Sequence, residues 1–333
     1  MMQSTTANEF TPYIRTVGRG PNLSRSLTRT EAFEAFQMIF AGLADPLQVG
    51  GLLIALRNRG ESPEEIAGMI DASRELITAP DVGELIELDW PIYADRHRQQ
   101  PWFILAAKLL AENGIRVLMH GIKGFAEGYA PTRPVLEQLG ITICPSLEDA
   151  ANCVEQNNIA YARIEDFCAP AHELFGLSPA LGVRTCINTF ARAINPLHAT
   201  AQILGVAHPP YLELHAETGR LMGQQRSTTI KGGGGEAQRN PLKKCRAITL
   251  IGQDIVEEIW PDMGLSERYD WRDESLDAAL PAKLWRGDVQ IEAPEAAVIA
   301  SAALALRTLG RVKNIVEADE KARDWWQNRD RTI

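Results

Sequence analysis

The stretch LLIALRNRGESPEEIAGM, residues 52–69, holds the end of one helix and the start of another. Apolar residues fill its first half at the spacing of a buried helix, and Gly60 ends that helix because glycine adopts a left-handed conformation at low cost. Ser62 and Glu65 then flank a proline that suits the first helical position, so the next helix begins at Pro63. The stretch therefore predicts two helices joined by a tight turn.

Upstream of this stretch, the sequence predicts a further helix. Thr28 and Glu31 have the spacing of a capping box. Three phenylalanines follow at helical spacing in the segment EAFEAFQMIFAG. We therefore predict an all-helical N-terminal domain over residues 1–78.

The apolar content of these helices favours self-association. The predicted helices over residues 31–41 and 47–59 carry large apolar side chains, namely Phe33, Phe36, Phe40, Leu52, Leu53 and Leu56. A three-helix module of this size has too little interior to hide all of them, and exposed apolar patches mark contact surfaces. We therefore predict a symmetric homodimer that buries them.

Beyond Pro80 the pattern changes to strands that alternate with helices. Short β-like runs such as IELDW (86–90), RVLMH (116–120) and TAQILGVA (200–207) are separated by helical stretches such as WFILAAKLLAENG. This alternation predicts a larger α/β domain over residues 79–333 with a central, mostly parallel sheet.

Composition excludes several classes of protein. Of the 333 residues, 45% are hydrophobic and 23% are charged, which is typical of a globular chain rather than a disordered one. No apolar run is long enough to span a bilayer and none resembles a signal peptide, so we expect a cytosolic protein without a membrane partner. The five cysteines form no C-x-x-C pair, which argues against a zinc knuckle and favours buried thiols.

Charge is segregated along the chain although the net charge is −9. Residues 11–30 carry four arginines and no acidic residue, and residues 226–246 carry six basic residues against one acidic residue. Residues 254–295 carry twelve acidic residues against four basic ones. An acidic chain with this distribution can still present a basic groove.

Three motifs resemble one known family. Residues 52–69 are similar to the N-terminal helical signature of anthranilate phosphoribosyltransferase, and FCAPAH (167–172) is similar to its F-x-A-P-x-H. LGVRTCINTFARAINP (181–196) is similar to its L-G-x-R-T-x-x-N-x-x-x-P-L-x-N-P. The resemblance covers nearly the whole chain. It implies a nucleoside phosphorylase/phosphoribosyltransferase-like fold, dimerisation through the helical part, and packing of residues 165–190 with the helical domain.

The sequence departs from this family at the positions that would be catalytic. The glycine-rich G-T-G-G-D loop, which in the family binds pyrophosphate, is replaced by YADRHR (93–98). K-H-G-N-R becomes MHGIK (119–123), the serine-rich phosphate loop becomes FAEGYA (125–130), and the Asp-Glu pair that binds magnesium becomes Glu236-Ala237. These departures predict no catalytic residues, no anthranilate phosphoribosyl transfer and no cofactor, with Glu236 as the remnant of a metal site.

Positive charge takes the place of these elements. Loops that follow the strands of an open α/β sheet bind ligands, and Lys and Arg there gain affinity for nucleic acid by releasing counterions. The pattern resembles anthranilate phosphoribosyltransferase-like proteins of the YbiB type, which keep the fold and bind nucleic acid without marked sequence preference. GRGPNLSRSLTR (18–29) also resembles their basic N-terminus. The predicted nucleic-acid-binding residues are Arg96, His97, Arg98, Lys123, Arg133, Lys231, Arg239 and Lys243.

Three functions therefore remain open from the sequence. The main hypothesis is a protein that binds DNA or RNA without sequence preference, because no helix-turn-helix, RRM or zinc-finger pattern would read bases. The alternative is a phosphoribosyl or glycosyl transferase of unknown substrate that uses Mg²⁺ with phosphoribosyl pyrophosphate, with arginines in place of backbone amides at the phosphates. The third is a protein that binds a small phosphorylated metabolite.

Overall fold

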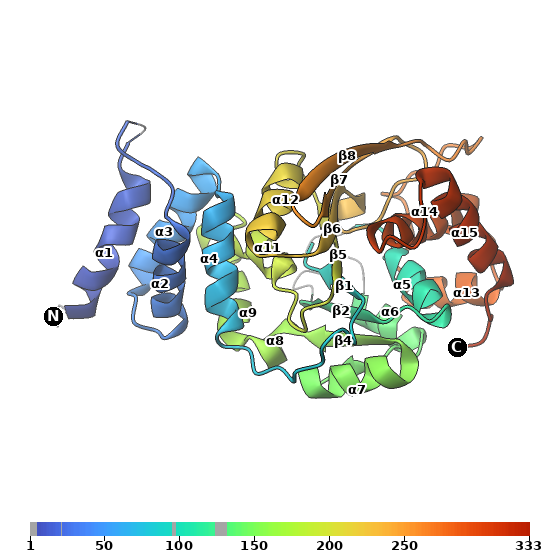
Figure 1. Cartoon of the computed structure of the whole chain (residues 1–333), viewed down its shortest axis with the longest axis horizontal. Coiled ribbons are helices and arrows are strands. Elements are labelled where there is room, and N and C mark those ends of the chain that lie inside the picture. The colour runs from blue at the N-terminus through green and yellow to red at the C-terminus, as the bar shows by residue number, and fades with distance from the viewer. Residues whose placement is uncertain (1–4, 21, 95–97, 124–131) are drawn as a thin grey trace. The chain divides into compact units, whose positions relative to one another are not determined.

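The computed structural model describes residues 5–20, 22–94, 98–123 and 132–333. The chain forms two units, each with its own interior (Figure 1). The first unit comprises Met1–Thr78 and Ile164–Pro196, and the second comprises Ala79–Arg163 and Leu197–Ile333. The fold class predicted from the sequence, a small helical domain and a larger α/β domain, is confirmed.

The first unit is all helical, and its helix starts agree with the sequence patterns. Thr28 and Glu31 form a capping box at the start of α2, and Ser62 and Glu65 form one at the start of α4. Gly60 ends α3 with a φ of 86°. The helices are α1 (Thr5–Gly18), α2 (Arg29–Phe40), α3 (Pro46–Arg59), α4 (Pro63–Arg74), α8 (Ile164–Phe167), α9 (Ala169–Phe175), α10 (Ser178–Leu181) and α11 (Ile187–Phe190), followed by the 3₁₀ turn Ala191–Ala193.

The interior of this unit holds most of the apolar side chains that we expected at a dimer contact. Phe36, Leu52, Leu53 and Leu56 are fully buried within the single chain, and Phe33 and Phe40 are half-buried. The reason is that α2 packs closely against α4, where a Cβ at Gly68 would overlap the main chain of α2, and that α3 packs against α1. The four fully buried side chains therefore do not provide the surface on which the dimer prediction rested.

The second unit is built on one sheet with the strand order β3-β4-β2-β1-β5-β6-β7-β8. Neighbouring strands are parallel from β3 to β6, and β7 and β8 are antiparallel additions. The strands are β1 (Leu88–Ile92), β2 (Val117–Gly121), β3 (Ile143–Cys144), β4 (Ile159–Arg163), β5 (Ala201–Val206), β6 (Arg226–Lys231), β7 (Cys245–Ile251) and β8 (Asp254–Trp260).

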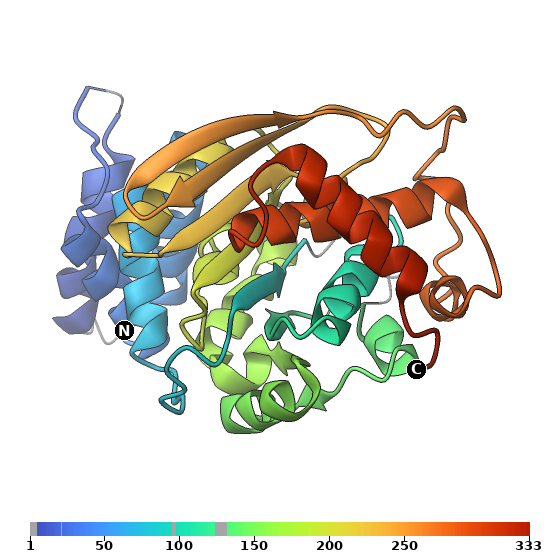
Figure 2. The same ribbon diagram turned by 45° about the vertical axis from the view of Figure 1, so that its right-hand side comes forward.

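Helices cover both faces of this sheet. The hydroxyl of Thr308 in α14 donates to Thr228 of β6 over 2.8 Å, whereas Gly219 of α12 lies against Ser227, which points to the other face. The α14 and α15 helices lie together beside the sheet (Figure 2). The helices of the unit are α5 (Phe103–Glu112), α6 (Thr132–Gln138), α7 (Leu147–Asn157), α12 (Tyr211–Leu221), α13 (Leu280–Arg286), α14 (Glu292–Thr308) and α15 (Ile315–Asn328), with the 3₁₀ turn Gly233–Gly235.

The strand β8 forms one edge of the sheet and is largely exposed. Glu257 pairs with Arg246 and Glu258 pairs with Arg307, both at 2.8 Å. Across the described residues, no helix has the length and apolarity needed to cross a membrane.

Candidate functional site

The candidate site lies at the edge of the sheet where the parallel strands end. Because β1, β2, β5 and β6 run in the same direction, the residues that follow them lie along one edge. Ala94 follows β1, Lys123 follows β2, and Lys231 ends β6. The antiparallel β7 begins at this same edge, so Lys243 lies there too.

A buried carboxylate already occupies part of this edge. Glu236 is 3% exposed, and its Oε1 accepts a hydrogen bond of 2.7 Å from the main-chain N–H of Ala94. A hydrogen bond from an amide to a carboxylate is charge-assisted and stronger than a neutral one. The N–H that follows β1 is therefore oriented to hold an anionic oxygen.

The glycine-rich segment 231–238 brings Glu236 to this position. Two hydrogen bonds hold the end of this segment in place. Gly233 N–H donates to the Gln238 carbonyl over 2.8 Å, and Phe103 N–H donates to Gln238 Oε1 over 3.1 Å. A Cβ at Gly205 in β5 would overlap the main chain of Glu236. Glycine at position 205 is therefore what lets the segment lie directly on β5.

Behind this edge lies a buried polar network that our sequence analysis missed. His120 of β2 lies 3.0 Å from Asp89 of β1 through Nε2 and 2.8 Å from the Tyr93 hydroxyl through Nδ1. Gln202 of β5 donates to the second Asp89 oxygen over 2.7 Å. The Asp89 carboxylate favours a proton on Nε2, so Nδ1 accepts from Tyr93. The network thus fixes Tyr93, the residue before Ala94.

The sequence did carry a signal for this network. Asp89 and Gln202 are polar residues inside otherwise apolar strands, and a polar side chain in a buried strand requires a partner. All four side chains are almost fully buried. Their pairing joins three neighbouring strands, which no single motif reveals.

A second anchor lies just beyond the first strand. Glu274 accepts hydrogen bonds from Gln100 N–H, 2.8 Å, and from the Trp102 indole, 2.7 Å. Burial raises the pKa of Glu274 above its ordinary value, against the lowering effect of these hydrogen bonds. These hydrogen bonds therefore attach the segment between β1 and α5 to the segment before α13.

The structure brings together some of the predicted basic residues. Arg98, Lys123, Lys231 and Lys243 are exposed and follow or precede strand ends at the same edge. Arg96 and His97 lie outside the described residues.

One of the predicted phosphate contacts needs correction, and Arg133 stays a prediction. Arg239 is completely buried: its guanidinium donates to Asp319 over 2.9 Å and to the Pro261 carbonyl over 2.6 Å, and it lies 4.6 Å from the centre of the Trp260 ring. It is a structural group rather than a surface contact. Arg133 is half-buried, with its guanidinium 5.8 Å from the centre of the Tyr161 ring.

The donor set for a metal ion is small. In the part of the chain that the structure describes, no three His, Cys, Asp or Glu side chains cluster as a metal site. Magnesium bound with a phosphorylated ligand needs only one or two protein carboxylates, because phosphates and waters complete its shell. Glu236 therefore fits a magnesium ion that arrives with phosphate ligands.

Comparison with known proteins agrees with this architecture. The glycosyl transferase family model for the helical bundle domain matches residues 11–77, and the model for the α/β domain matches residues 104–328. An anthranilate phosphoribosyltransferase from Methylocella silvestris is 31% identical over 63% of this chain and 60% of its own length. The uncharacterized protein YbiB of Escherichia coli is 28% identical over 74% of this chain and 77% of its length.

Solved structures share this fold. The anthranilate phosphoribosyltransferase from Thermus thermophilus superposes with a TM-score of 0.79 at 26% identity, covering 95% of this chain and 94% of its own. The enzyme from Saccharomyces cerevisiae in complex with PRPP and Mg has a TM-score of 0.75 at 16% identity, over 96% and 94% of the two chains, which shows the shared fold.

These comparisons overturn our main functional hypothesis. The prediction of a nucleic-acid-binding protein is wrong, because the matched relatives and structures of known activity are anthranilate phosphoribosyltransferases. The YbiB-type branch has weak support from one uncharacterized relative. The α/β model alone matches more than half of the chain. The chain belongs to the glycosyl transferase family that combines a helical bundle domain with an α/β domain.

Proposed function

We propose that the chain binds a phosphoribosyl pyrophosphate-type donor at the carboxyl edge of its sheet and transfers the phosphoribosyl group to an acceptor. The observation that carries this proposal is the set of exposed lysines Lys123, Lys231 and Lys243 at one edge of the sheet, where the buried Glu236 carboxylate is held by the Ala94 N–H at 2.7 Å. The positive charge of these lysines matches a donor that carries several negatively charged phosphate groups.

The chemistry of these groups matches such a donor. Lysine ammonium groups bind phosphate oxygens as point charges. The transfer breaks the bond between the ribose C1 and a pyrophosphate oxygen. It forms a bond from C1 to the acceptor, which loses a proton. The lysines would stabilise the charge that develops on the pyrophosphate.

Glu236 would hold the magnesium ion that accompanies the donor in the yeast enzyme. When bound, such an ion would offset the negative charge of the pyrophosphate. The chain's own contribution is to place the carboxylate: segment 231–238 lies on Gly205, and the Ala94 N–H orients Oε1.

Titration calorimetry with phosphoribosyl pyrophosphate and Mg²⁺ tests donor binding. We expect Lys231→Ala to weaken binding about tenfold, the effect of losing one charge-assisted contact. Lys313→Ala is the matched control, because Lys313 is exposed and close in sequence to Arg311, which pairs with Glu87 before β1 at the opposite edge. Equal affinities of the two variants, or no binding by the natural chain, would contradict the proposal.

Pyrophosphate release tests transfer. The natural chain would be incubated with the donor, Mg²⁺ and a panel of acceptors comprising anthranilate, other aromatic amines and nucleobases. The sequence departures predict that anthranilate is not the acceptor. We expect release with another acceptor and a reduced rate in Glu236→Gln. No release above the donor-only rate with any acceptor would overturn the transferase assignment.

A further inference from the structure

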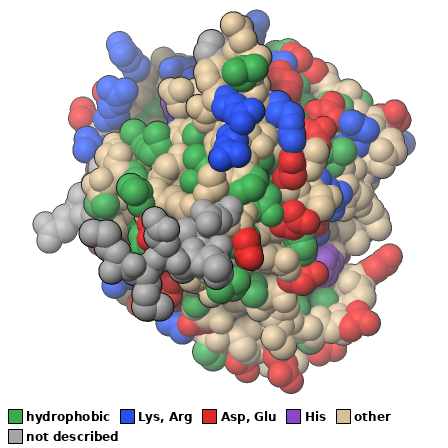
Figure 3. All heavy atoms as spheres, turned by 90° about the vertical axis from the view of Figure 1, so that its left-hand side faces the viewer, with side chains coloured by type: hydrophobic (Ala, Val, Ile, Leu, Met, Phe, Trp, Pro, Cys, Tyr) green, Lys and Arg blue, Asp and Glu red, His purple; other side chains and the backbone are tan. Residues whose placement is uncertain are grey.

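The first unit carries a hollow of about 520 Å³ where the end of α1 meets the segment that leads to α2. Three arginines line it: Arg15 and Arg19 from α1 and its end, and Arg25 from the segment. No carboxylate is among the lining side chains in the part of the chain that the structure describes. Basic side chains gather in groups on the face that α1 presents (Figure 3). We propose that this hollow binds a small organic phosphate ester.

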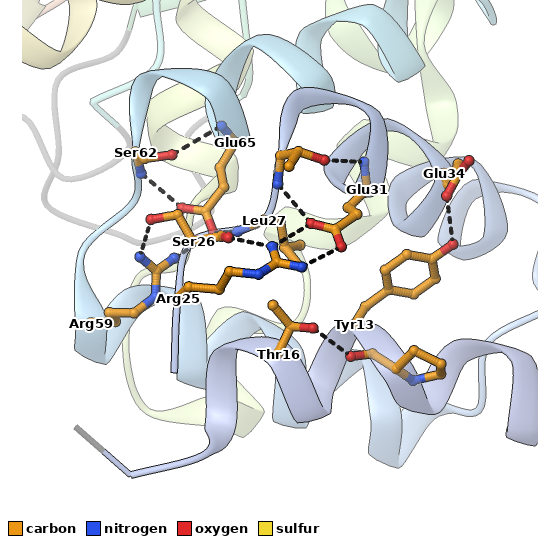
Figure 4. A network of polar contacts seen from close by, with 12 residues as sticks. Tyr13, Thr16, Arg25, Ser26, Leu27, Glu31, Glu34, Arg59, Ser62 and Glu65 are labelled. Atoms are coloured by element: carbon orange, nitrogen blue, oxygen red, sulfur yellow. Dashed lines mark hydrogen bonds and ion pairs between the residues drawn. The ribbon is translucent and has the colours of Figure 1, made fainter. Parts of the chain in front are cut away.

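Arg25 is held in position before any ligand arrives. Its guanidinium makes two hydrogen bonds to the Glu31 carboxylate, 2.6 and 2.7 Å, and one of 2.9 Å to the Ser26 carbonyl. Figure 4 shows the Arg25 side chain extending toward Glu31, with Thr16 and Tyr13 of α1 nearby. A preordered guanidinium loses little side-chain entropy when it binds a ligand.

The backbone of the segment is also fixed. Arg25 N–H donates to the Thr16 carbonyl over 3.1 Å, and the N–H groups of Leu23 and Ser24 donate to the Gly20 carbonyl over 2.9 and 3.1 Å. These bonds tie the segment back to α1. The hollow is therefore a built feature of the helical unit.

Arg15 and Arg19 provide the uncompensated charge. Within the described residues, neither forms an ion pair with a carboxylate, and because both line the same hollow their like charges repel. The helix dipole favours a cation such as Arg15 in the last turn of α1, but it does not explain the convergence with Arg25. An anion bound between the arginines would relieve the repulsion.

The size and lining of the hollow indicate the ligand class. Arginine forks match the oxygen geometry of phosphate. A free phosphate ion would leave most of the 520 Å³ unfilled, whereas pockets for small organic ligands span about 300–1,000 Å³. Leu23 lines the hollow and is 74% exposed, which gives an apolar surface for the organic part of an ester.

Titration of the full chain with ribose 5-phosphate tests this site. We expect binding that is at least about tenfold weaker in Arg15→Gln/Arg19→Gln, since two charge-assisted contacts are lost. Arg323→Gln, which removes an exposed arginine of α15, is the matched control and should bind as the natural chain does. Thermal melting should be unchanged in all variants, because exposed charges contribute little to stability.

Further measurements separate this site from the proposed transferase site and from other ligands. Lys231→Ala should keep the affinity for ribose 5-phosphate at the hollow. Equal affinity for inorganic phosphate would overturn the organic-ester assignment. Binding to anionic lipid vesicles without binding of the soluble ester would overturn the small-ligand assignment. If Lys231→Ala lost affinity for ribose 5-phosphate and the double arginine variant kept it, the ligand would bind at the sheet edge. That result would overturn the proposal.

Discussion

Lys231 ends β6 and Arg239 follows that strand, yet the structure gives them opposite environments. Lys231 is exposed at the sheet edge. Arg239 turns inward to Asp319 and the Trp260 ring. Both residues lie in one basic segment of the sequence. The sequence could not show that Arg239 would be buried in an ion pair with Asp319, which lies 80 positions further along the chain.

Arg239→Ala should destabilise the second unit without changing donor affinity. Removing one partner of a buried pair leaves polar groups unpaired, so we expect the free energy of unfolding to fall by about 3 kcal/mol. All seven tryptophans lie in this unit, so urea unfolding followed by tryptophan fluorescence reports on it directly. An unchanged midpoint would show that the buried pair is not needed, and Arg323→Ala serves as the exposed control.

Glu31 should make the first unit sensitive to acid. The Arg25 guanidinium lowers the pKa of Glu31 to about 2, so its contribution to stability is present above the ordinary carboxyl pKa and is lost as the pH falls toward 2. The Arg25 side chain is 56% exposed, so solvent screens the pair and we expect only a small loss of stability. Carbon-13 NMR titration of the Glu31 carboxyl in the natural chain and in Arg25→Gln checks the shift; identical titration curves would refute it.

At the scale of elements, local signals were enough for helix ends and insufficient for the site. The caps at Thr28 and Ser62 depend on residues within four positions, so the sequence predicted them correctly. The Asp89–His120–Tyr93–Gln202 network depends on the register of three strands, which is set by packing of the whole sheet. The contact between Gly205 and segment 231–238 has the same origin.

Gly205→Ala should disturb the site through that segment. The added Cβ would overlap the Glu236 main chain, so the segment must move and the Ala94 hydrogen bond must lengthen. We expect a loss of about 2 kcal/mol in unfolding free energy, typical of overpacking, together with weaker donor binding. Gly20→Ala is the control, since no atom lies within 4 Å of the added Cβ. Natural stability and affinity in Gly205→Ala would show that the segment does not depend on this contact.

At the scale of the whole molecule, the homodimer remains a prediction, and the structure offers a different surface for it. Leu47 and Ile54 of α3 are 84% and 38% exposed, and Gly51 lies between them on the same face. Their spacing places them on one stripe of the helix, where a glycine allows a partner to approach closely. Such a stripe suits a second copy of the chain.

Light scattering would test this surface. We expect the natural chain at micromolar concentration to have twice the 36.7 kDa mass of one chain, and Leu47→Asp/Ile54→Asp to shift it to the single-chain mass. The double variant should keep its helical content, because both side chains are exposed. A monomer mass for the natural chain would refute the prediction.

The exposed edge strand β8 affects the tendency of the protein to aggregate at high concentration. Its outer main-chain N–H and C=O groups have no neighbouring strand among the described residues, and such an edge is a template on which sheets of separate molecules can join. Asp254 places an exposed carboxylate on it, and Glu257 and Glu258 form ion pairs with Arg246 and Arg307, so a second strand laid against it would have to remove these charged groups from water. These charged side chains oppose the edge-to-edge pairing of sheets that would lead to fibrous aggregates. Replacing Asp254, Glu257 and Glu258 by apolar residues should remove this protection and let the edges of separate molecules join into insoluble aggregates.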